Sequence, residues 1–550
     1  MATAINFDGL GSDDSRPLGI DVATREFVRA FFRCSTQEKF PCVCPNDTAL
    51  GQFKAYAQDE RIDPERCHGV NQNDADSLEQ SGHLFRYDPG FIKHVWARRQ
   101  FGQQRYSISG LVHASSTDSA METFGQYLTA PTQSWDALIC PSNSIKSAVM
   151  TVVEHWQDYL KQRTGSDFKC PMQFPVIPLG VDTRHFNAIT GEPKRSEQRE
   201  RLKIENDEIV ILYSGRLNFI AKANPLPLLL GVERAAVESK TPVHLVFCGY
   251  FNDELNEQAF KEAAASVCNL AKVSFIQHGD TDFPDGFWAG ADIFCSLADN
   301  IQESFGLTPI EAMASGLPVV VSDWDGYRDT VRDGVDGYTI PTLAPRKGLG
   351  EDIAYKYFSS QSNYGDHLSA TQQSISIDLD ELVKAFKHLI ETPSLRQKMG
   401  EAGKDRANAV FAWPRIIMAY EELWAELAER RATAAESAPR AKEMPFHPSY
   451  PDPFDMFADF PSEHFSESGE IELVIKNWTE AMKLISLKVG FVYPHSLIEL
   501  EDMPFLLGHL EPGAPVPIKV LIDLLPKLDS NNLVLTLAWL TKLGICRYHP

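Results

Sequence analysis

The feature that most constrains the fold is a series of short apolar segments that alternate with helix-like segments and that begins again midway along the chain. Because parallel strands cannot be joined by tight turns, this alternation predicts strands connected by crossover helices. The predicted strands of the first series are AINFDG, FPCVC, YSISGLVH, DALICPS and FPVIPLG. The second series follows LKIENDEIVILYSGR, with VHLVFCGY, KVSFIQHGD, ADIFCSLA and LPVVVSD. The sequence therefore predicts two doubly wound, Rossmann-like α/β domains.

The chain of 550 residues is long enough for two or three domains with separate cores. We place the first domain at residues 1–180 and the second at 181–410. Residues 411–436 carry apolar side chains at helical spacing, which predicts an amphipathic helix that packs back on the first domain. The proline-, alanine- and charge-rich segment 437–450 predicts a linker. Residues 451–550 are expected to form a small, mainly helical accessory domain.

The composition limits the partners of the protein. A formal net charge of −23 argues against general binding to nucleic acid or anionic lipid, so any phosphate site has to be built locally. The ten cysteines form no regular framework, and Cys42, Cys44 and Cys67 lack the usual zinc spacing. We expect neither a metal nor another cofactor. Without a signal peptide or a long apolar run, we expect a cytoplasmic protein that has no transmembrane segment but that could contact a membrane peripherally.

The segment NIQESFGLTPIEAMASGLPVVVSDWDG, residues 300–326, is predicted to contain a loop, a short helix and a buried strand. We expect Thr308 to cap the helix, Pro309 to occupy its first turn, and Gly316 to end it. In parallel sheets the N-termini of such helices lie at the carboxyl edge of the strands, where they favour anions. The turn predicted to face a phosphate consists of Ser304, Phe305, Gly306, Leu307 and Thr308.

Two glutamates, Glu303 and Glu311, border this turn. A carboxylate beside a phosphate is unfavourable unless it accepts hydrogen bonds from sugar hydroxyls, so the pair could hold two different sugars. Both also have structural interpretations. Thr308 and Glu311 match a capping box, and Glu303 could be a solvated loop residue. The residues alone leave these alternatives open.

The motifs and their order resemble the retaining glycosyltransferase family 4, which has the two-domain GT-B fold. Residues 303–320 are similar to the E-x7-E element of the family, and DGVDGYTIP at 333–341 is similar to its closing turn. VIPLGVDTRHF at 176–186 resembles the interdomain crossing, and YSGRLNFIAKANPLPLLL at 213–230 the G-R-L…K segment. The resemblance covers about residues 1–431.

The resemblance implies transfer of a sugar from a nucleotide-diphosphate sugar to an acceptor hydroxyl, with retention at the anomeric carbon by front-face attack and without a metal. Glu311 would hold the ribose hydroxyls, and Glu303 the hydroxyls of the donor sugar. Arg216 and Lys222 would bind the diphosphate, where a guanidinium fork and an ammonium can stabilise the charge of the leaving group.

Several further residues are candidates for the donor site. Gly9, Gly11 and Gly19 follow the first predicted strand without the strict G-x-G-x-x-G spacing. By resemblance, their loop approaches the diphosphate and the acceptor, and Gly19 is the best candidate for close contact. Gly215 and Gly249, at strand ends, are the other donor-binding glycines.

His113 ends a predicted strand, so it could contact the donor sugar or leaving group, or could be a satisfied core histidine. Trp324 and Asp325 stand where the family commonly has a small glycine-rich turn. We predict that this bulkier turn shapes the sugar pocket.

The last hundred residues lie outside the resemblance. Their final two predicted helices, joined at 529–531, resemble a helix-turn-helix or winged-helix ending. However, residues 451–550 contain fourteen Asp plus Glu against seven Lys plus Arg, which opposes binding to nucleic acid. We expect this part to contact a partner protein, an acceptor carrier or a second subunit. The aromatic run PFDMFADFPSEHF could pack against the first two domains or dock a partner, and we expect packing. A phosphorylase, a nucleotide-sugar epimerase and a non-catalytic scaffold with the same fold remain alternatives.

Overall fold

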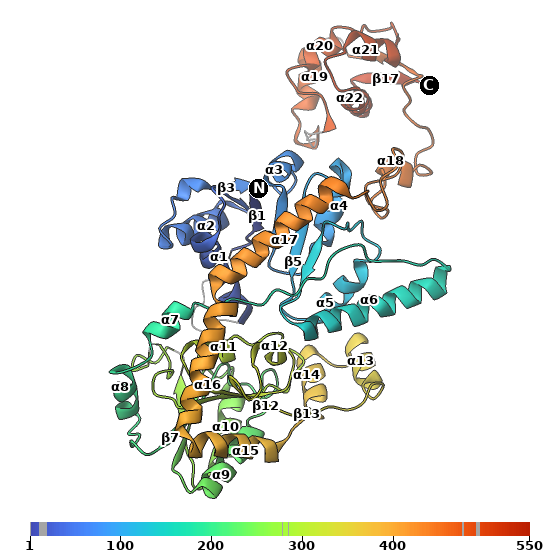
Figure 1. The fold of residues 1–550 in the computed structure, drawn as a ribbon. Coiled ribbons are helices and arrows are strands. Elements are labelled where there is room, and N and C mark those ends of the chain that lie inside the picture. The colour runs from blue at the N-terminus through green and yellow to red at the C-terminus, as the bar shows by residue number, and fades with distance from the viewer. Residues whose placement is uncertain (1, 10–18, 278, 284, 476–477, 491–495) are drawn as a thin grey trace. The chain divides into compact units, whose positions relative to one another are not determined.

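The computed structural model describes residues 2–9, 19–277, 279–283, 285–475, 478–490 and 496–550. The chain forms two compact units, Met1–His447 and Pro448–Pro550. Within the described residues, the first unit contains two six-stranded parallel sheets and the second a three-stranded antiparallel sheet (Figure 1). None of the helices among the described residues is both long and apolar enough to cross a membrane.

The first sheet has the strand order β3-β2-β1-β4-β5-β6. In register, Ile5 lies opposite Cys42 on one side and Phe85 on the other. The strands are β1 Thr3–Asn6, β2 Phe40–Val43, β3 Cys67–Val70, β4 His83–Arg86, β5 Ser107–Leu111 and β6 Ala137–Ile139. The helices are α1 Gly19–Cys34, α2 Asp47–Asp59, α3 Ala75–Ser81, α4 Ile92–Phe101, α5 Asp118–Gln126 and α6 Asn143–Thr164.

The second sheet has the order β12-β11-β10-β7-β8-β9, which repeats the order of the first sheet strand for strand. Its strands are β7 Ile209–Ser214, β8 Val243–Gly249, β9 Lys272–Gln277, β10 Ile293–Ser296, β11 Val319–Ser322 and β12 Gly337–Ile340. The helices of this domain are α7 Thr183–Ala188, α8 Lys194–Arg201, α9 Pro225–Ser239, α10 Glu254–Val267, α11 Leu307–Ala314, α12 Tyr327–Thr330, α15 Leu379–Glu391 and α16 Pro393–Arg406. Both sheets thus have a doubly wound topology, with switch points between β1 and β4 and between β7 and β10.

The second domain also carries a helical hairpin. The short strands β13 (Thr342–Leu343) and β14 (Ser376–Ile377) pair antiparallel, and helices α13 (Glu351–Phe358) and α14 (Tyr364–Gln372) lie between them in the sequence. The strand pair closes the base of the hairpin.

The structure corrects some of the predicted strands. FPVIPLG is not a strand, because its two prolines cannot donate to a ladder; the stretch makes only isolated bridges, such as Val176 with Cys140. The strands β3, β4 and β12 were not predicted.

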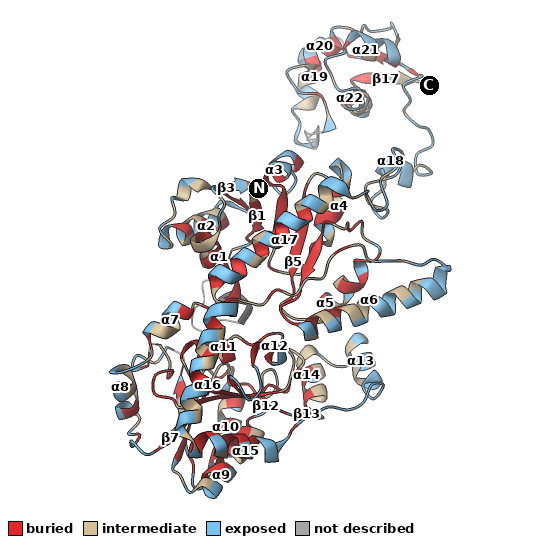
Figure 2. Cartoon of the chain, viewed as in Figure 1, coloured by how far each residue is buried: buried red, intermediate tan, exposed pale blue. Residues whose placement is uncertain are grey.

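Most residues of the inner strands are buried, whereas the edge strands β3, β9 and β12 also carry exposed or half-buried residues (Figure 2). The three valines of β11 are fully buried, which explains the unbroken apolar run. The chain returns to the first domain through α17, Trp413–Thr433, drawn in orange in Figure 1. The structure buries the six apolar residues that were predicted to face the core, Ile416, Ile417, Tyr420, Leu423, Trp424 and Leu427.

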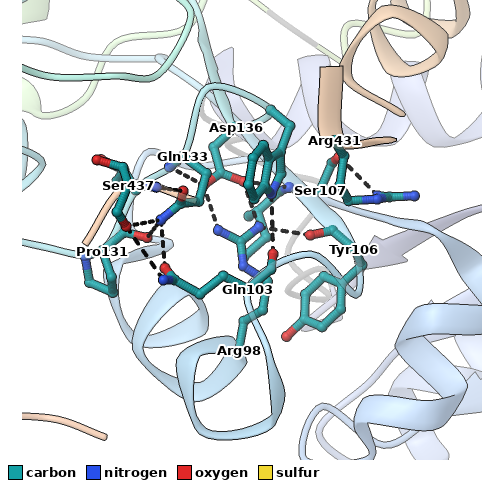
Figure 3. A network of polar contacts seen from close by, with 12 residues as sticks. Arg98, Gln103, Tyr106, Ser107, Pro131, Gln133, Asp136, Arg431 and Ser437 are labelled. Atoms are coloured by element: carbon teal, nitrogen blue, oxygen red, sulfur yellow. Dashed lines mark hydrogen bonds and ion pairs between the residues drawn. The ribbon is translucent and has the colours of Figure 1, made fainter. Parts of the chain in front are cut away.

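A buried polar network holds the end of this returning segment (Figure 3). Arg98 donates two hydrogen bonds to Asp136, at 2.7 and 2.6 Å, and both side chains are fully buried. Asp136 also accepts from the amides of Ile108 and Gln133, at 3.0 and 2.8 Å. The Gln133 side chain then donates to the Ser437 carbonyl and accepts from the Ser437 amide, at 2.9 and 2.8 Å.

Further contacts fix the chain beyond Ser437. Arg99 donates to the carbonyls of Pro445 and Phe446, and the rings of Trp96 and His447 lie 4.3 Å apart. Most of the segment 437–450, predicted as a linker, is therefore attached to the first unit, because its main-chain groups are hydrogen-bonded there.

The second unit combines its sheet, ordered β16-β15-β17, with several helices. Its elements are α18 Pro453–Met456, β15 Glu470–Leu473, α19 Trp478–Ile485, α20 Met503–Leu507, β16 Val516–Pro517, α21 Ile518–Leu524, α22 Ser530–Lys542 and β17 Cys546–His549. Within the second unit, Phe454 and Phe460 of the aromatic run are 68% and 81% exposed, and the packing of the run against the first two domains stays a prediction. Phe465 does pack, stacking on Tyr548 at 4.3 Å.

Candidate active site

The candidate site lies at the carboxyl edge of the second sheet, where the strand order reverses between β7 and β10. Chain segments that leave neighbouring strands in opposite directions leave a crevice there. The segment after β7 carries Arg216 and Lys222, and the segment after β10 carries Glu303. Lys222 and Glu303 form an ion pair, with side chains 19% and 10% exposed. The fold thus brings Glu303 beside two cations that lie about 80 residues earlier in the sequence.

Arg216 differs from Lys222 in its partners. Its guanidinium donates to the side-chain oxygen of Gln302 and to the carbonyl of Ala221, both at 3.2 Å. These acceptors are neutral, and Arg216 makes no ion pair with any described residue. The arrangement fixes the direction of the guanidinium without neutralising its charge, which suits a site for an anion.

Gly215 and Gly249 allow the backbone to come close at this edge. Gly215 has a φ of +142°, in the region that side chains rarely adopt, and a Cβ on Gly249 would lie 1.8 Å from the Gly215 carbonyl oxygen. The main chains after β7 and β8 are therefore in direct contact.

We expect Gly249→Ala to weaken donor binding by at least about 10-fold and to lower the free energy of unfolding by about 1–3 kcal/mol, because the Gly215 main chain has to move. Calorimetric titration and urea unfolding measure the two effects. Gly51→Ala is the control, since a Cβ there meets nothing within 4 Å. If the two variants behaved alike, the close approach would have no role in the site.

The turn before α11 is built differently from the prediction. The helix begins at Leu307, and its N-cap is Gly306, with a φ of +81° and no side-chain cap. The predicted cap by Thr308 and the capping box with Glu311 are wrong, because Thr308 already lies within the helix. Its hydroxyl is buried without a hydrogen-bond partner. The N-terminus of α11 therefore keeps its affinity for an anion.

The other residues of this turn hold it against neighbouring segments of the chain. Phe305 is buried, and a Cβ on Gly326 would lie 2.4 Å from its Cα, so the two loops pack main chain against main chain. The Ser304 carbonyl accepts a hydrogen bond from the Ser142 hydroxyl of the first domain at 3.0 Å. Leu307 is partly buried and packs against the same apolar cluster as Phe305.

Glu311 lies one turn into α11 and is partly buried. Burial raises the pKa of its carboxyl to about 7; the charge of Glu26 on α1 raises it further, and the charge of Lys222 lowers it. Glu311 therefore senses charges from both domains, as a residue beside an interdomain cleft does.

This raised pKa predicts how stability depends on pH. The folded protein holds the Glu311 proton more tightly than the unfolded chain does, so the unfolding free energy falls as pH rises from the ordinary carboxyl value through about 7. We expect Glu311→Gln to remove about 1–3 kcal/mol of the fall between pH 5 and pH 8. Urea unfolding at both pH values measures it, with Glu254→Gln as an exposed control. An unchanged pH dependence in Glu311→Gln would contradict the prediction.

Trp324 and Asp325 lie in a loop that contacts both the site and the first domain. The Trp324 indole donates to the Asn300 carbonyl at 3.0 Å. Asp325 has a φ of +42°, and its carbonyl accepts from the Ser144 hydroxyl at 3.2 Å. Burial, followed by the charge of Glu303, raises the Asp325 pKa to about 8.

His113 and Gly19 are the site residues that were predicted for the first domain. His113 follows β5, and its Nε2 is buried without a partner. Burial lowers its pKa to about 4, against the opposing effects of Asp88 and of a hydrogen bond with the Tyr87 main chain. The ring is thus neutral at pH 7 with one nitrogen unsatisfied, unlike a satisfied core histidine. Gly19 is the first residue of α1, and Gly11 lies outside the described residues.

The sequence analysis missed Asp299, which is the first residue of the predicted loop. Its carboxylate accepts from the Gln372 side chain at 2.5 Å and from the Asn224 amide at 3.3 Å, and burial raises its pKa to about 7. A polar residue just after a buried parallel strand is the signal that could have found it. Gln372, on α14, has no such signal.

Comparison with known proteins agrees with this geometry. Residues 194–351 match the family described as glycosyl transferases group 1. The matched part of the chain is similar to that family and runs from α8 to the start of α13. The D-inositol 3-phosphate glycosyltransferase of Geodermatophilus obscurus is 22% identical over 364 residues, which cover 64% of this chain and 70% of the relative. The phosphatidyl-myo-inositol mannosyltransferase of Mycobacterium leprae is 33% identical over 238 residues, 42% of this chain and 54% of the relative.

A solved structure supports the fold of the chain. A glycosyltransferase from Rickettsia africae has a TM-score of 0.50 at 15% identity and covers 78% of this chain and 98% of its own. Together with the two doubly wound sheets, this confirms the GT-B fold expected from the motifs.

Proposed function

We propose that the protein transfers a sugar from a nucleotide-diphosphate sugar to an acceptor hydroxyl, with retention of anomeric configuration. The observation that carries the proposal is the convergence of Arg216, Lys222 and Glu303 with the uncapped N-terminus of α11 at one switch point. A diphosphate fits the cations and the helix N-terminus, and sugar hydroxyls fit the carboxylates.

The residues have distinct roles in this mechanism. When the glycosidic bond breaks, negative charge builds on the departing diphosphate, and Arg216, Lys222 and the helix amides stabilise it. In the free protein Lys222 neutralises Glu303. A bound donor replaces this ion pair, because its phosphate attracts the ammonium and its sugar hydroxyls donate to Glu303. Glu311 accepts from the ribose hydroxyls.

The acceptor then attacks from the face that the leaving group vacates. A diphosphate oxygen takes the proton of the acceptor hydroxyl, so neither an enzymic nucleophile nor a metal is required. Closure of the two domains around both substrates excludes water and limits hydrolysis of the donor. The cysteines, all ten of which are described and free, suit a reducing compartment such as the cytoplasm.

A thermal-shift panel of nucleotides and nucleotide sugars tests the proposal. A donor at 100 times its Kd stabilises the native state by about 2.7 kcal/mol. The best donor is then assayed for turnover with sugar and inositol phosphate acceptors, the latter suggested by the name of the Geodermatophilus relative. If no nucleotide sugar stabilised the protein, or if the donor were converted without any acceptor, as by an epimerase, the proposal would fail.

Donor preference is expected to depend on Trp324. Trp324→Gly removes the indole and its hydrogen bond to Asn300, and we expect the ratio of kcat/KM between two donor sugars to change by about 10-fold. Competition between two nucleotide sugars in one reaction measures the ratio. An unchanged ratio would show that this turn does not shape the sugar pocket.

A further inference from the structure

The α13–α14 hairpin extends beyond the part of the chain that matches the family. The match ends at residue 351, where α13 begins, so α14 lies outside it. The strands β13 and β14 close the hairpin at its base, with Thr342 opposite Ile377. Its helices therefore form a structured element that the family match does not explain.

The hairpin belongs to the second domain but contacts the first. The Tyr364 hydroxyl lies 2.9 Å from the Ser116 hydroxyl, and the Tyr357 hydroxyl accepts from the Asp118 amide at 3.1 Å. Both partners lie at the start of α5. The His367 ring stacks on Tyr357, with centroids 4.4 Å apart and planes at 13°. Two tyrosines thus attach the hairpin across the interdomain boundary.

The same hairpin reaches the candidate active site. Gln372 at the end of α14 donates to Asp299 at 2.5 Å. Tyr364 also lies beside Gln302, and burial of the Tyr364 phenol raises its pKa against the effects of Ser116 and Gln302. Gln302 in turn accepts from Arg216 at 3.2 Å. A continuous series of contacts therefore runs from the first domain through Tyr364 and Gln302 to Arg216.

We propose that the α13–α14 hairpin is a latch between the domains, in which Tyr364 positions Arg216 through Gln302 only when Ser116 is in contact. The proposal rests on the proposed function for Arg216. Tyr364 touches no substrate in this account and is a positioning residue.

The physical reason is the geometry of the guanidinium. A planar fork stabilises a diphosphate well only in the correct orientation, and small displacements of a catalytic group cost large factors in rate. The Gln302 oxygen sets the direction of one Arg216 nitrogen, and in this proposal the neighbouring Tyr364 side chain restrains Gln302. When the domains separate, Tyr364 loses Ser116, so the restraint on Gln302 and Arg216 is strongest in the closed form. The latch thereby couples closure to catalysis.

The chain offers a matched pair of variants. Tyr364→Phe and Tyr357→Phe each remove one hydroxyl from the hairpin and one hydrogen bond to the first domain, but only Tyr364 connects to Gln302. With the donor that the thermal-shift panel identifies, we expect Tyr364→Phe to lower kcat by about 10-fold with the donor KM within about twofold. Tyr357→Phe should stay within about twofold of wild type in both. Equal losses in the two variants would show that the tyrosines only hold the domains together, and would overturn the proposal.

A double-mutant cycle tests the route. Because Tyr364 acts through Gln302, Tyr364→Phe should lower kcat no further in a Gln302→Ala background. Independent, multiplying effects of the two substitutions would overturn the proposed connection.

Hydrogen exchange of the full chain supplies a test that needs no donor. Tyr364→Phe should speed amide exchange in residues 215–224, which carry Arg216, as well as in α5, whereas Tyr357→Phe should affect α5 alone. Unchanged exchange at 215–224 in Tyr364→Phe would overturn the latch even if the protein binds nucleotide sugars. Conversely, faster exchange there in a protein that binds none would leave the latch standing and reject only the proposed function.

Discussion

Arg216→Ala is expected to lower kcat by about 100- to 1000-fold, the usual cost of removing one preorganised group that stabilises transition-state charge. The midpoint of thermal unfolding should move by no more than a few degrees. Arg216 makes no ion pair with a described residue, and its hydrogen bonds go to neutral acceptors, so its removal leaves no carboxylate unpaired. Steady-state kinetics with the identified donor and a thermal scan measure the two effects.

Two further variants define what Arg216 supplies. Arg216→Lys keeps a positive charge but loses the fork that holds two phosphate oxygens, so we expect an intermediate loss of about 10-fold. Arg234→Ala removes an exposed arginine that pairs with Asp380, and it should change neither activity nor stability measurably. If Arg216→Ala unfolded the protein, the arginine would be structural. If the variant kept the kcat of wild type, the arginine would have no part in the reaction.

The sequence predicted the second domain well because its local signals agree with its tertiary environment. The apolar runs of β10 and β11 are bounded by turn residues and buried on both faces, so the pattern of each strand is visible without its neighbours. Since ligands bind at the carboxyl ends of such strands, Arg216 and Glu303 could be placed in one crevice from their positions alone.

Other features could not be predicted, because they depend on contacts that the local sequence does not encode. Both Thr308 and Gly306 precede an apolar run, and only the left-handed φ of Gly306 decides where α11 begins. Tyr364 and Ser116 are 248 residues apart, and no pattern near either residue announces the contact. Arg98 and Asp136 resemble surface charges in the sequence, since fully buried Arg and Asp are rare unless paired.

That buried pair carries the largest expected effect on stability. We expect Asp136→Asn to lower the free energy of unfolding by about 3–5 kcal/mol, because it leaves the fully buried Arg98 guanidinium without a counter-charge. The asparagine also presents an amide donor where Asp136 accepts hydrogen bonds from Arg98 and from main-chain amides. Chemical denaturation followed by tryptophan fluorescence measures the loss, since Trp135 and Trp424 are buried in this domain.

The controls separate the buried charge from charge in general. Asp59→Asn breaks an ion pair at the surface, in which the side chain of Arg29 is 34% exposed and that of Asp59 is 56% exposed. It should lower the free energy of unfolding by less than about 1 kcal/mol. The double variant Arg98→Met with Asp136→Leu removes both charges and should recover part of the loss. Recovery is expected to be incomplete, because the amides of Ile108 and Gln133 lose their acceptor. If Asp136→Asn cost no more than Asp59→Asn, water would have to reach Arg98, and the network could not anchor the segment at Ser437.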